Sequence, residues 1–181
     1  IGGRLVFEGA GMDIDAQSGR LWGVALGRTR ATIADFREEL LRIEGGGEGP
    51  AQDMMRFIDE SPLRNRIDDF TRGIAVSGAA KLALKLDIPL DDVDATRVAG
   101  AVRFEGNDID VDPAVPPFSR VAGTLEFSER ALALRGMSGG FLGGTVRVDG
   151  ETPEAGRFAL RASGSASAGG IRLLADNALT R

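Results

Sequence analysis

The sequence predicts a mainly β fold with a few short helices, built from long antiparallel repeated strands. The first observation is one-sided patterning: between residues 78 and 149, apolar and polar residues alternate with a period of two, which places the apolar side chains on one face of each strand. The second is a strand phrase that recurs along the chain. The third is that the connections between these runs are too short to hold a crossover helix, so neighbouring strands should be antiparallel.

The repeated phrase consists of Gly, any residue, Leu or Val, any residue and Phe, followed after four residues by two aliphatic residues or Met flanking one position. Its three copies are Gly3, Leu5, Phe7, Met12, Ile14; Gly100, Val102, Phe104, Ile109, Val111; and Gly123, Leu125, Phe127, Leu132, Leu134. The first and third copies differ by 120 at every position (123 − 3), and the second and third by 23 (123 − 100). Such constant offsets indicate a repeated β architecture.

Residues 1–181 are expected to form a single β-rich segment whose first part, 1–45, is a meander of about four short antiparallel strands. Leu5 and Phe7 share one face of its first strand, and Trp22 lies in a later strand. The run Gly45 to Gly49 is expected to end the sheet.

Residues 50–72 are expected to form a helical insert. Pro50 suits the first position of a helix, where a missing N–H costs nothing, and Gly73 suits the end of the insert. Helical spacing predicts two short helices joined at Ser61 and Pro62. Their apolar positions are Met54, Phe57 and Ile58 in the first helix and Leu63, Ile67 and Phe70 in the second.

Long antiparallel strands should fill residues 74–168, and a short helix residues 169–181. The longest strand candidate runs from Ile74 to Leu90, followed by an acidic turn and a strand from Val98 to Phe104. Within the candidate the two faces are clearly separated. The apolar face holds Leu82, Leu84, Leu86, Ile88 and Leu90, and the polar face holds Lys81, Ala83, Lys85 and Asp87.

Composition excludes several classes of function. The chain has no His and no Cys, so it cannot build a Ser-His-Asp triad, a thiol nucleophile or an ordinary zinc or copper site. We therefore expect no enzyme activity, no catalytic residue, no metal site and no cofactor. The net charge is −5 and the basic residues are scattered singly, so we expect no nucleic acid partner. No run approaches the length of a membrane-spanning helix.

Three weak motifs are better explained by structure than by chemistry. Asp108, Asp110 and Asp112 begin like a calcium loop, but Pro113 and Ser119 stand where such a loop needs Gly and Glu, so a solvated strand face is expected. The glycines of segment 139–144 lack the ending of a phosphate loop and should mark strand bends or bulges. Lys81 lies four residues after Ser77, not three, and is expected to be a surface lysine.

The pattern leaves open where the apolar faces point. Two sheets closing face to face would make Leu5, Phe7, Leu84, Leu86, Phe104 and Phe127 a dry sandwich core. One long sheet that curls without closing would leave the same residues lining an open apolar trough, suited to a ligand with a long hydrocarbon part.

Four stretches resemble the YhdP branch of the AsmA-like proteins. They are Phe57-Ile-Asp-Glu-Ser-Pro-Leu63, Leu86-Asp-Ile-Pro-Leu90, Val98-Ala-Gly-Ala-Val-Arg-Phe104 and Val121-Ala-Gly-Thr-Leu-Glu-Phe127. The resemblance implies an elongated, curled sheet with a hydrophobic groove, in a periplasmic segment of an inner-membrane-anchored protein. It also implies phospholipid as the partner, with both membranes of a Gram-negative envelope reached through regions outside this segment, and it brings no catalytic residues. Because the chain begins at Ile1, we expect it to be a piece of a longer or processed protein.

The first functional hypothesis is therefore a non-enzymatic segment that conducts phospholipid acyl chains along an apolar β groove. The second is a structural or adhesive β domain that binds protein through a sheet edge. For the first hypothesis, the expected groove lining is Leu5, Phe7, Leu82, Leu84, Leu86, Val102, Phe104, Leu125, Phe127, Leu132 and Leu134.

Overall fold

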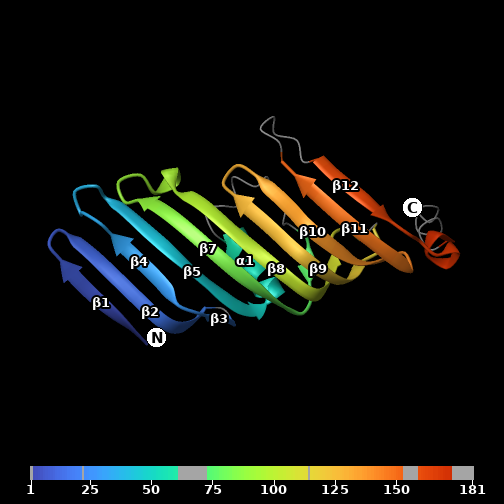
Figure 1. The fold of residues 1–181 in the computed structure, drawn as a ribbon, viewed down its shortest axis with the longest axis horizontal. Helices are drawn as coiled ribbons and strands as arrows, with labels where there is room; N and C mark the ends of the chain where they lie inside the picture. Colours follow the sequence, from blue (N-terminus) through green and yellow to red (C-terminus); the bar gives the residue numbers. More distant parts are fainter. Residues whose placement is uncertain (1, 22, 61–72, 114, 153–158, 173–181) are drawn as a thin grey trace.

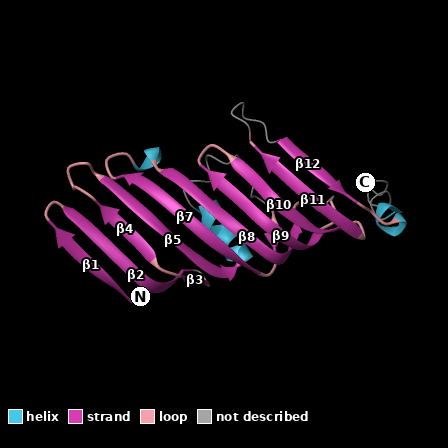
Figure 2. Ribbon diagram, in the orientation of Figure 1, coloured by secondary structure: helices cyan, strands magenta, loops and turns pink. Residues whose placement is uncertain are grey.

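The computed structural model describes residues 1–181 except 1, 22, 61–72, 114, 153–158 and 173–181. Its strands are β1 (Gly2–Glu8), β2 (Gly11–Leu21), β3 (Val24–Leu26), β4 (Thr29–Ile33), β5 (Leu40–Pro50), β6 (Ala75–Val76), β7 (Ala79–Pro89), β8 (Arg97–Asp110), β9 (Phe118–Ser128), β10 (Leu132–Phe141), β11 (Gly144–Glu151) and β12 (Ala159–Gly164). One α-helix, α1 (Ala51–Glu60), follows β5, and a short 3₁₀ turn, η2 (Val93–Ala95), joins β7 to β8. Residues 168–172 are also helical. The mainly β fold with a few short helices is confirmed (Figure 2).

All the described strands belong to one 12-stranded sheet, with the order β1-β2-β3-β5-β7-β8-β9-β10-β11-β12. β4 pairs with β2 and β5, and β6 pairs with β8. Every pairing is antiparallel, and the strands follow one another in chain order along an elongated sheet (Figure 1). The described strands form no second sheet against this one, so the sandwich alternative is wrong.

Two strand positions are each filled by two short pieces. β3 and β4 both lie between β2 and β5, and β6 and β7 both pair with β8. The second interruption is at Gly78, whose φ of 82° favours glycine. The predicted single strand from Ile74 to Leu90 is therefore wrong in its first part, and β8, with 14 residues, is the longest strand.

A buried asparagine holds the break at Gly78. Asn107 is 2% exposed, and its Nδ2 donates hydrogen bonds to the carbonyl oxygens of Ser77 (2.7 Å) and Ala79 (2.9 Å). Its Oδ1 accepts a hydrogen bond from the amide of Glu105 (3.0 Å). The same residue lies in a bulge of β8 next to Gly106, where the pairing with β9 shifts register. Asn107 thus satisfies backbone groups that the irregular pairing leaves over.

The prediction that Gly45 to Gly49 ends the sheet is wrong, because β5 runs through this stretch to Pro50. Glycine is needed there for close packing. A Cβ on Gly45 would lie 2.6 Å from Thr29 Oγ1, and one on Gly47 would lie 2.8 Å from Val24 Cγ1. In this strand glycine therefore marks a close approach and not a turn.

Helix α1 begins one residue later than predicted, since Pro50 is the last residue of β5. The amide of Ala51 donates to the carbonyl of Gly78 (2.9 Å), and Gln52 Oε1 accepts from the amide of Val76 (2.8 Å). Ala51, Met54 and Met55 are at most 3% exposed. The second predicted helix and the last predicted helical residues lie outside the described residues, as do Trp22 and the side chains of Phe57 and Ile58.

The first and third copies of the phrase are hairpins with the same register. Phe7 pairs with Met12 and Leu5 with Ile14 in β1 and β2, just as Phe127 pairs with Leu132 and Leu125 with Leu134 in β9 and β10. The second copy is different, because Gly100 to Ile109 lie within the single strand β8. The bulge at Gly106 and Asn107 takes the place of a turn there.

The glycines of segment 139–144 are only partly as expected. Gly139 and Gly140 lie in β10, and Leu142 and Gly143 form a two-residue hairpin turn with positive φ at both positions (50° and 72°), which suits the twist of antiparallel strands. The pairing of β10 with β11 shifts register between Leu134 and Met137, before these glycines. The pairing of β10 with β9 shifts between Arg135 and Ser138 and again between Ser138 and Gly140, so one irregularity falls at Gly139, as expected. Asp108, the first carboxylate of the acidic motif, lies on β8. Its Oδ1 accepts a hydrogen bond from the amide of Arg120 (2.9 Å).

Candidate functional site

One face of the sheet is apolar from end to end. Residues paired directly across antiparallel strands point to the same face, so the register identifies its members. Leu86 pairs with Ile43 and Val98, Leu82 pairs with Val102, and Val102 pairs with Leu125. The series continues through Leu134 on β10, and on the other side through Ala31, Ile14 and Leu5 to β1. The register of the sheet therefore aligns the apolar positions of neighbouring strands from both halves of the chain.

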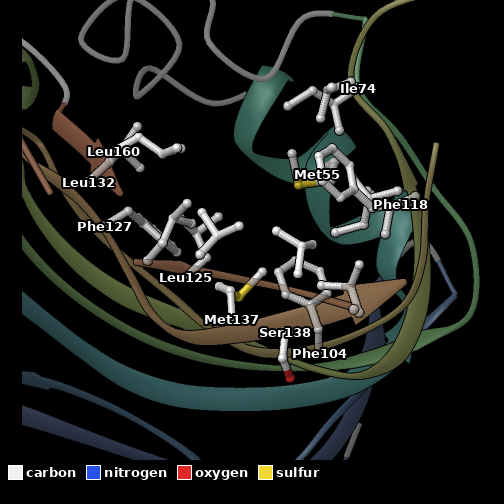
Figure 3. Close-up of a pocket in the computed structure, with 18 of the residues that line it drawn as sticks. Met55, Ile74, Phe104, Phe118, Leu125, Phe127, Leu132, Met137, Ser138 and Leu160 are labelled. Carbon is white, nitrogen blue, oxygen red and sulfur yellow. The ribbon is translucent and has the colours of Figure 1, made fainter. Parts of the chain in front are cut away.

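A cavity of about 430 Å³ lies on this face over β8 to β12. Figure 3 shows Phe127, Leu132 and Leu160 on one side of it and Met55, Ile74 and Phe118 on the other, with Leu125 and Met137 rising from the sheet between them. None of the lining side chains is charged. Its lining hydroxyl residues are Ser128 and Ser138. Ser128 Oγ accepts hydrogen bonds from the amides of Arg130 and Ala131 in the turn after β9. The cavity therefore presents hydrocarbon to whatever enters it.

The expected lining residues fall into three groups. Phe104, Leu125, Phe127, Leu132 and Leu134 line the cavity. Val102 is 1% exposed and fully packed, and Leu82, Leu84 and Leu86 are partly buried against the same core. Leu5 and Phe7 lie on the same face at the far edge, with 54% and 65% of their surface exposed. The structure thus brings five of them together in one cavity and spreads the others along the apolar face.

Several lining residues were not predicted, and they have two origins. Val146 and Val148 lie on β11, where they continue the apolar alternation of the strands. Met137 lies on β10 after the register shift that follows Leu134, so it reaches the apolar face at an odd spacing. Met55, Ile74 and Phe118 come from helix α1 and from strand ends, so no strand period could identify them. The Phe118 ring stacks on Phe141, with ring centroids 4.5 Å apart. This stacking fixes the Phe118 side of the cavity wall.

Helix α1 covers part of the apolar face. Met54 and Met55 belong to the core cluster formed with Val24, Val76 and Ala80 of the sheet, and Met55 also lines the cavity. The flexible thioether side chain of Met suits an irregular wall. The helix therefore closes the cavity on the side of Ile74 and Phe118, as Figure 3 shows.

The opposite face carries alternating charges that pair across strands. Arg30 pairs with Asp13, Lys85 with Glu44 (2.7 Å) and Lys81 with Glu105 (3.0 Å). The hydrogen bond from Arg28 holds the pKa of Asp15 below its ordinary value, and that from Lys85 does the same for the pKa of Glu44. These groups are exposed, or half-buried in the case of Asp13 and Asp15, so each ion pair contributes little to stability. Their combined effect is to make this face prefer water.

The residues of the apolar face and the cavity suit contact with hydrocarbon. Within the described residues, no group of three or more carboxylates, histidines or cysteines is placed to hold a metal ion. Among the described helices, none has the length and apolar content needed to cross a membrane. The described site is the apolar face of the sheet together with the cavity over β8 to β12.

Comparison with known proteins gives one family and one curated relative. The family model described as YhdP protein matches residues 1–181. The curated relative, from Escherichia coli (strain K12), is described as intermembrane phospholipid transporter YhdP and is 24% identical over 150 residues. The match covers 83% of this chain and 12% of the relative, so the chain spans a small part of that protein's length. No solved structure matches.

Proposed function

The chain belongs to the YhdP family, and on that premise we propose that it is a lipid-transport segment whose apolar face carries the acyl chains of phospholipids. The acyl chains lie against β7 to β12 and the headgroup stays in water beyond the strand ends. The lipid moves along the face without chemical change, so the segment is not an enzyme and needs no cofactor. It works in the periplasm of a Gram-negative envelope, between membranes that other parts of the protein reach.

The observation that carries this proposal is the continuity of the apolar face on a sheet with no second sheet against it among the described strands. A soluble domain usually buries such a face, because exposed apolar surface is costly. Here a cavity of about 430 Å³ with uncharged lining remains on it. A hydrocarbon chain fits this environment better than any polar ligand does.

The energies are suitable for transport. Burial of one methylene is worth about 0.8 kcal/mol, so about ten methylenes against Leu125, Leu134 and their neighbours gain roughly 8 kcal/mol. That corresponds to roughly micromolar affinity before the cost of ordering the chain. Such binding holds a lipid and still releases it to the next part of the face.

Two variants with the same new charge on opposite faces test the proposal. Leu134→Glu puts a carboxylate into the cavity wall, whereas Thr124→Glu puts it on the polar face, where Thr124 pairs with Arg103 and Arg135. Phospholipid that co-purifies with each chain is measured by mass spectrometry of organic extracts, and folding by circular dichroism. We expect lipid on the unmodified chain and on Thr124→Glu, and at least tenfold less on folded Leu134→Glu.

Two results would contradict the proposal. One is an equal amount of co-purified phospholipid on both variants. The other is no phospholipid on the unmodified chain when the chain is purified from cells whose membranes contain phospholipid. If Leu134→Glu unfolds, Val148→Glu supplies the same test from β11, because Val148 also lines the cavity and is only partly buried.

A further inference from the structure

The second and third copies of the phrase pair with each other in a complementary register. In the antiparallel pair of β8 and β9, Gly100 lies opposite Phe127, Val102 opposite Leu125, and Phe104 opposite Gly123. Each copy therefore places its Phe opposite the Gly of the other copy. Along the pair, the Gly, aliphatic residue and Phe of one phrase thus lie opposite the Phe, aliphatic residue and Gly of the other.

The side chains show why this register is favoured. A Cβ on Gly100 would lie 2.3 Å from Cζ of Phe127, so the phenyl ring lies over the glycine and occupies the space that a side chain would need. Phe127 is 8% exposed and Phe104 is 4% exposed in this arrangement. A slip of one residue would turn the apolar residues of one strand to the opposite face. Above Gly123 the space is taken by Met137 of β10, whose Cα would lie 2.6 Å from a Cβ there. Packing of a phenyl ring over a glycine therefore favours this register at the pair of Gly100 and Phe127.

The first copy has no such partner among the described strands. Gly3, Leu5 and Phe7 lie on β1, which is the edge of the sheet and pairs only with β2 in the part of the chain that the structure describes. Phe7 is 65% exposed, far more than Phe104 and Phe127. An exposed strand edge offers unpaired backbone groups to a further strand.

The opposite edge of the sheet differs. β12 presents Leu160, Ala162 and Gly164 on the apolar face, in register with Gly150, Val148 and Val146 of β11. It carries no Phe and so no copy of the phrase. Of the two described edges of the sheet, the β1 edge is therefore the one that carries the repeated phrase.

We propose that the edge of β1 that pairs with no described strand binds an antiparallel strand carrying the same phrase, with the partner's Phe over Gly3 and the partner's Gly opposite Phe7. The residue before the partner's Phe is acidic, because it lies opposite Arg4 on the polar face. The third copy, Gly-Thr-Leu-Glu-Phe, has this acidic residue at Glu126, whereas the second copy has Arg103 there. This inference goes beyond the proposed function, since the pairing needs no lipid.

The probe is a fluorescently labelled peptide with the sequence of residues 120–128, Arg-Val-Ala-Gly-Thr-Leu-Glu-Phe-Ser. Its control is the isomer with Gly and Phe exchanged, which has the same composition but places Phe against Phe7. A second peptide, residues 97–105, carries Arg before Phe. Binding of each peptide to the 181-residue chain is measured by fluorescence anisotropy.

We expect the first peptide to bind at least tenfold more tightly than its isomer, and severalfold more tightly than the peptide of residues 97–105. Phe7→Ala in the chain should weaken binding of the first peptide at least tenfold. Phe36→Ala, which removes another exposed phenyl ring (45% exposed) in a turn outside the strands, should leave it unchanged. Equal binding of the peptide and its isomer, no binding of either, or full binding by folded Phe7→Ala would overturn the proposal. If Phe7→Ala does not fold, the comparison of peptide and isomer on the unmodified chain still decides.

Discussion

Replacing Asn107 should destabilise the protein more than replacing any other polar residue of β8. Its side chain makes three hydrogen bonds to backbone groups, at 2.7, 2.9 and 3.0 Å, and it is almost fully buried. Two of the bonds hold Ser77 and Ala79 on either side of Gly78. The carbonyl of Gly78 in turn accepts the hydrogen bond that anchors the first residue of α1. Loss of Asn107 therefore weakens both the strand break and the attachment of the helix.

The magnitude follows from these bonds. Each is worth about 1 kcal/mol net, so Asn107→Ala should lose about 3 kcal/mol of unfolding free energy. Ser77 and Ala79 are exposed residues, so water can replace part of what their carbonyls lose, which lowers the expected cost to about 2 kcal/mol. Typical domains have only about 5 to 15 kcal/mol of stability in all. The loss is large enough to measure with ease.

Urea unfolding followed by circular dichroism measures the effect. With a denaturant slope of about 2 kcal/mol per molar, the midpoint should fall by about 1 M. Asp110→Ala, an exposed change on the same strand, is the matched control and should shift stability by less than about 0.5 kcal/mol. Hydrogen exchange at the amide of Ala51 should also become faster in Asn107→Ala. Equal midpoints for the two variants would refute the reasoning.

Four further outcomes are expected. Asn107→Asp directs a carboxylate at two carbonyl oxygens, so its folded pKa is raised above the unfolded value, and its deficit in urea midpoint relative to the unmodified chain should widen as the pH rises from about 4. Met55→Ala should cost about 2 to 4 kcal/mol in the same assay, because it leaves a space where α1 meets the cavity. Gly45→Val should cost about 1 to 3 kcal/mol, because its Cβ would meet Thr29 at 2.6 Å. Lys85 lowers the pKa of Glu44, so the contribution of this pair to the free energy of unfolding is present above the ordinary pKa of 4.5 and is lost as the pH falls through the folded pKa. Glu44→Gln should therefore flatten the loss of stability at acid pH. An unchanged loss at acid pH would contradict the assignment.

The sequence predicted the strands well wherever one face is buried. The alternation of Leu82, Leu84 and Leu86 places them correctly on the apolar face, and the offset of 120 between copies identifies two hairpins with the same register. Both signals arise because a pleated strand has a side-chain period of two. The alternation of apolar and polar residues reflects which face of a strand is buried, and it does not identify the neighbouring strand.

The sequence could not predict the features that depend on contacts between distant segments. The glycines of β5 appeared to end the sheet, but Thr29 and Val24 fill the space above them. The second copy of the phrase has the same spacing as the others, yet it forms a bulge because Asn107 supplies hydrogen bonds in place of a turn. Met55 reaches the cavity from a helix, outside any strand period. Periodicity also could not decide between a closed sandwich and a single sheet, since both place the same residues on the apolar face.

A photo-crosslinking amino acid placed at two positions tests the central claim most directly. At Leu134 the probe lies in the cavity wall, and at Thr124 it lies on the opposite face of the neighbouring strand. The chain is irradiated in Gram-negative cells, and the adducts are identified by mass spectrometry. We expect a phospholipid adduct at position 134 and none at position 124. Equal labelling at both positions, or no lipid adduct at 134, would contradict the central claim.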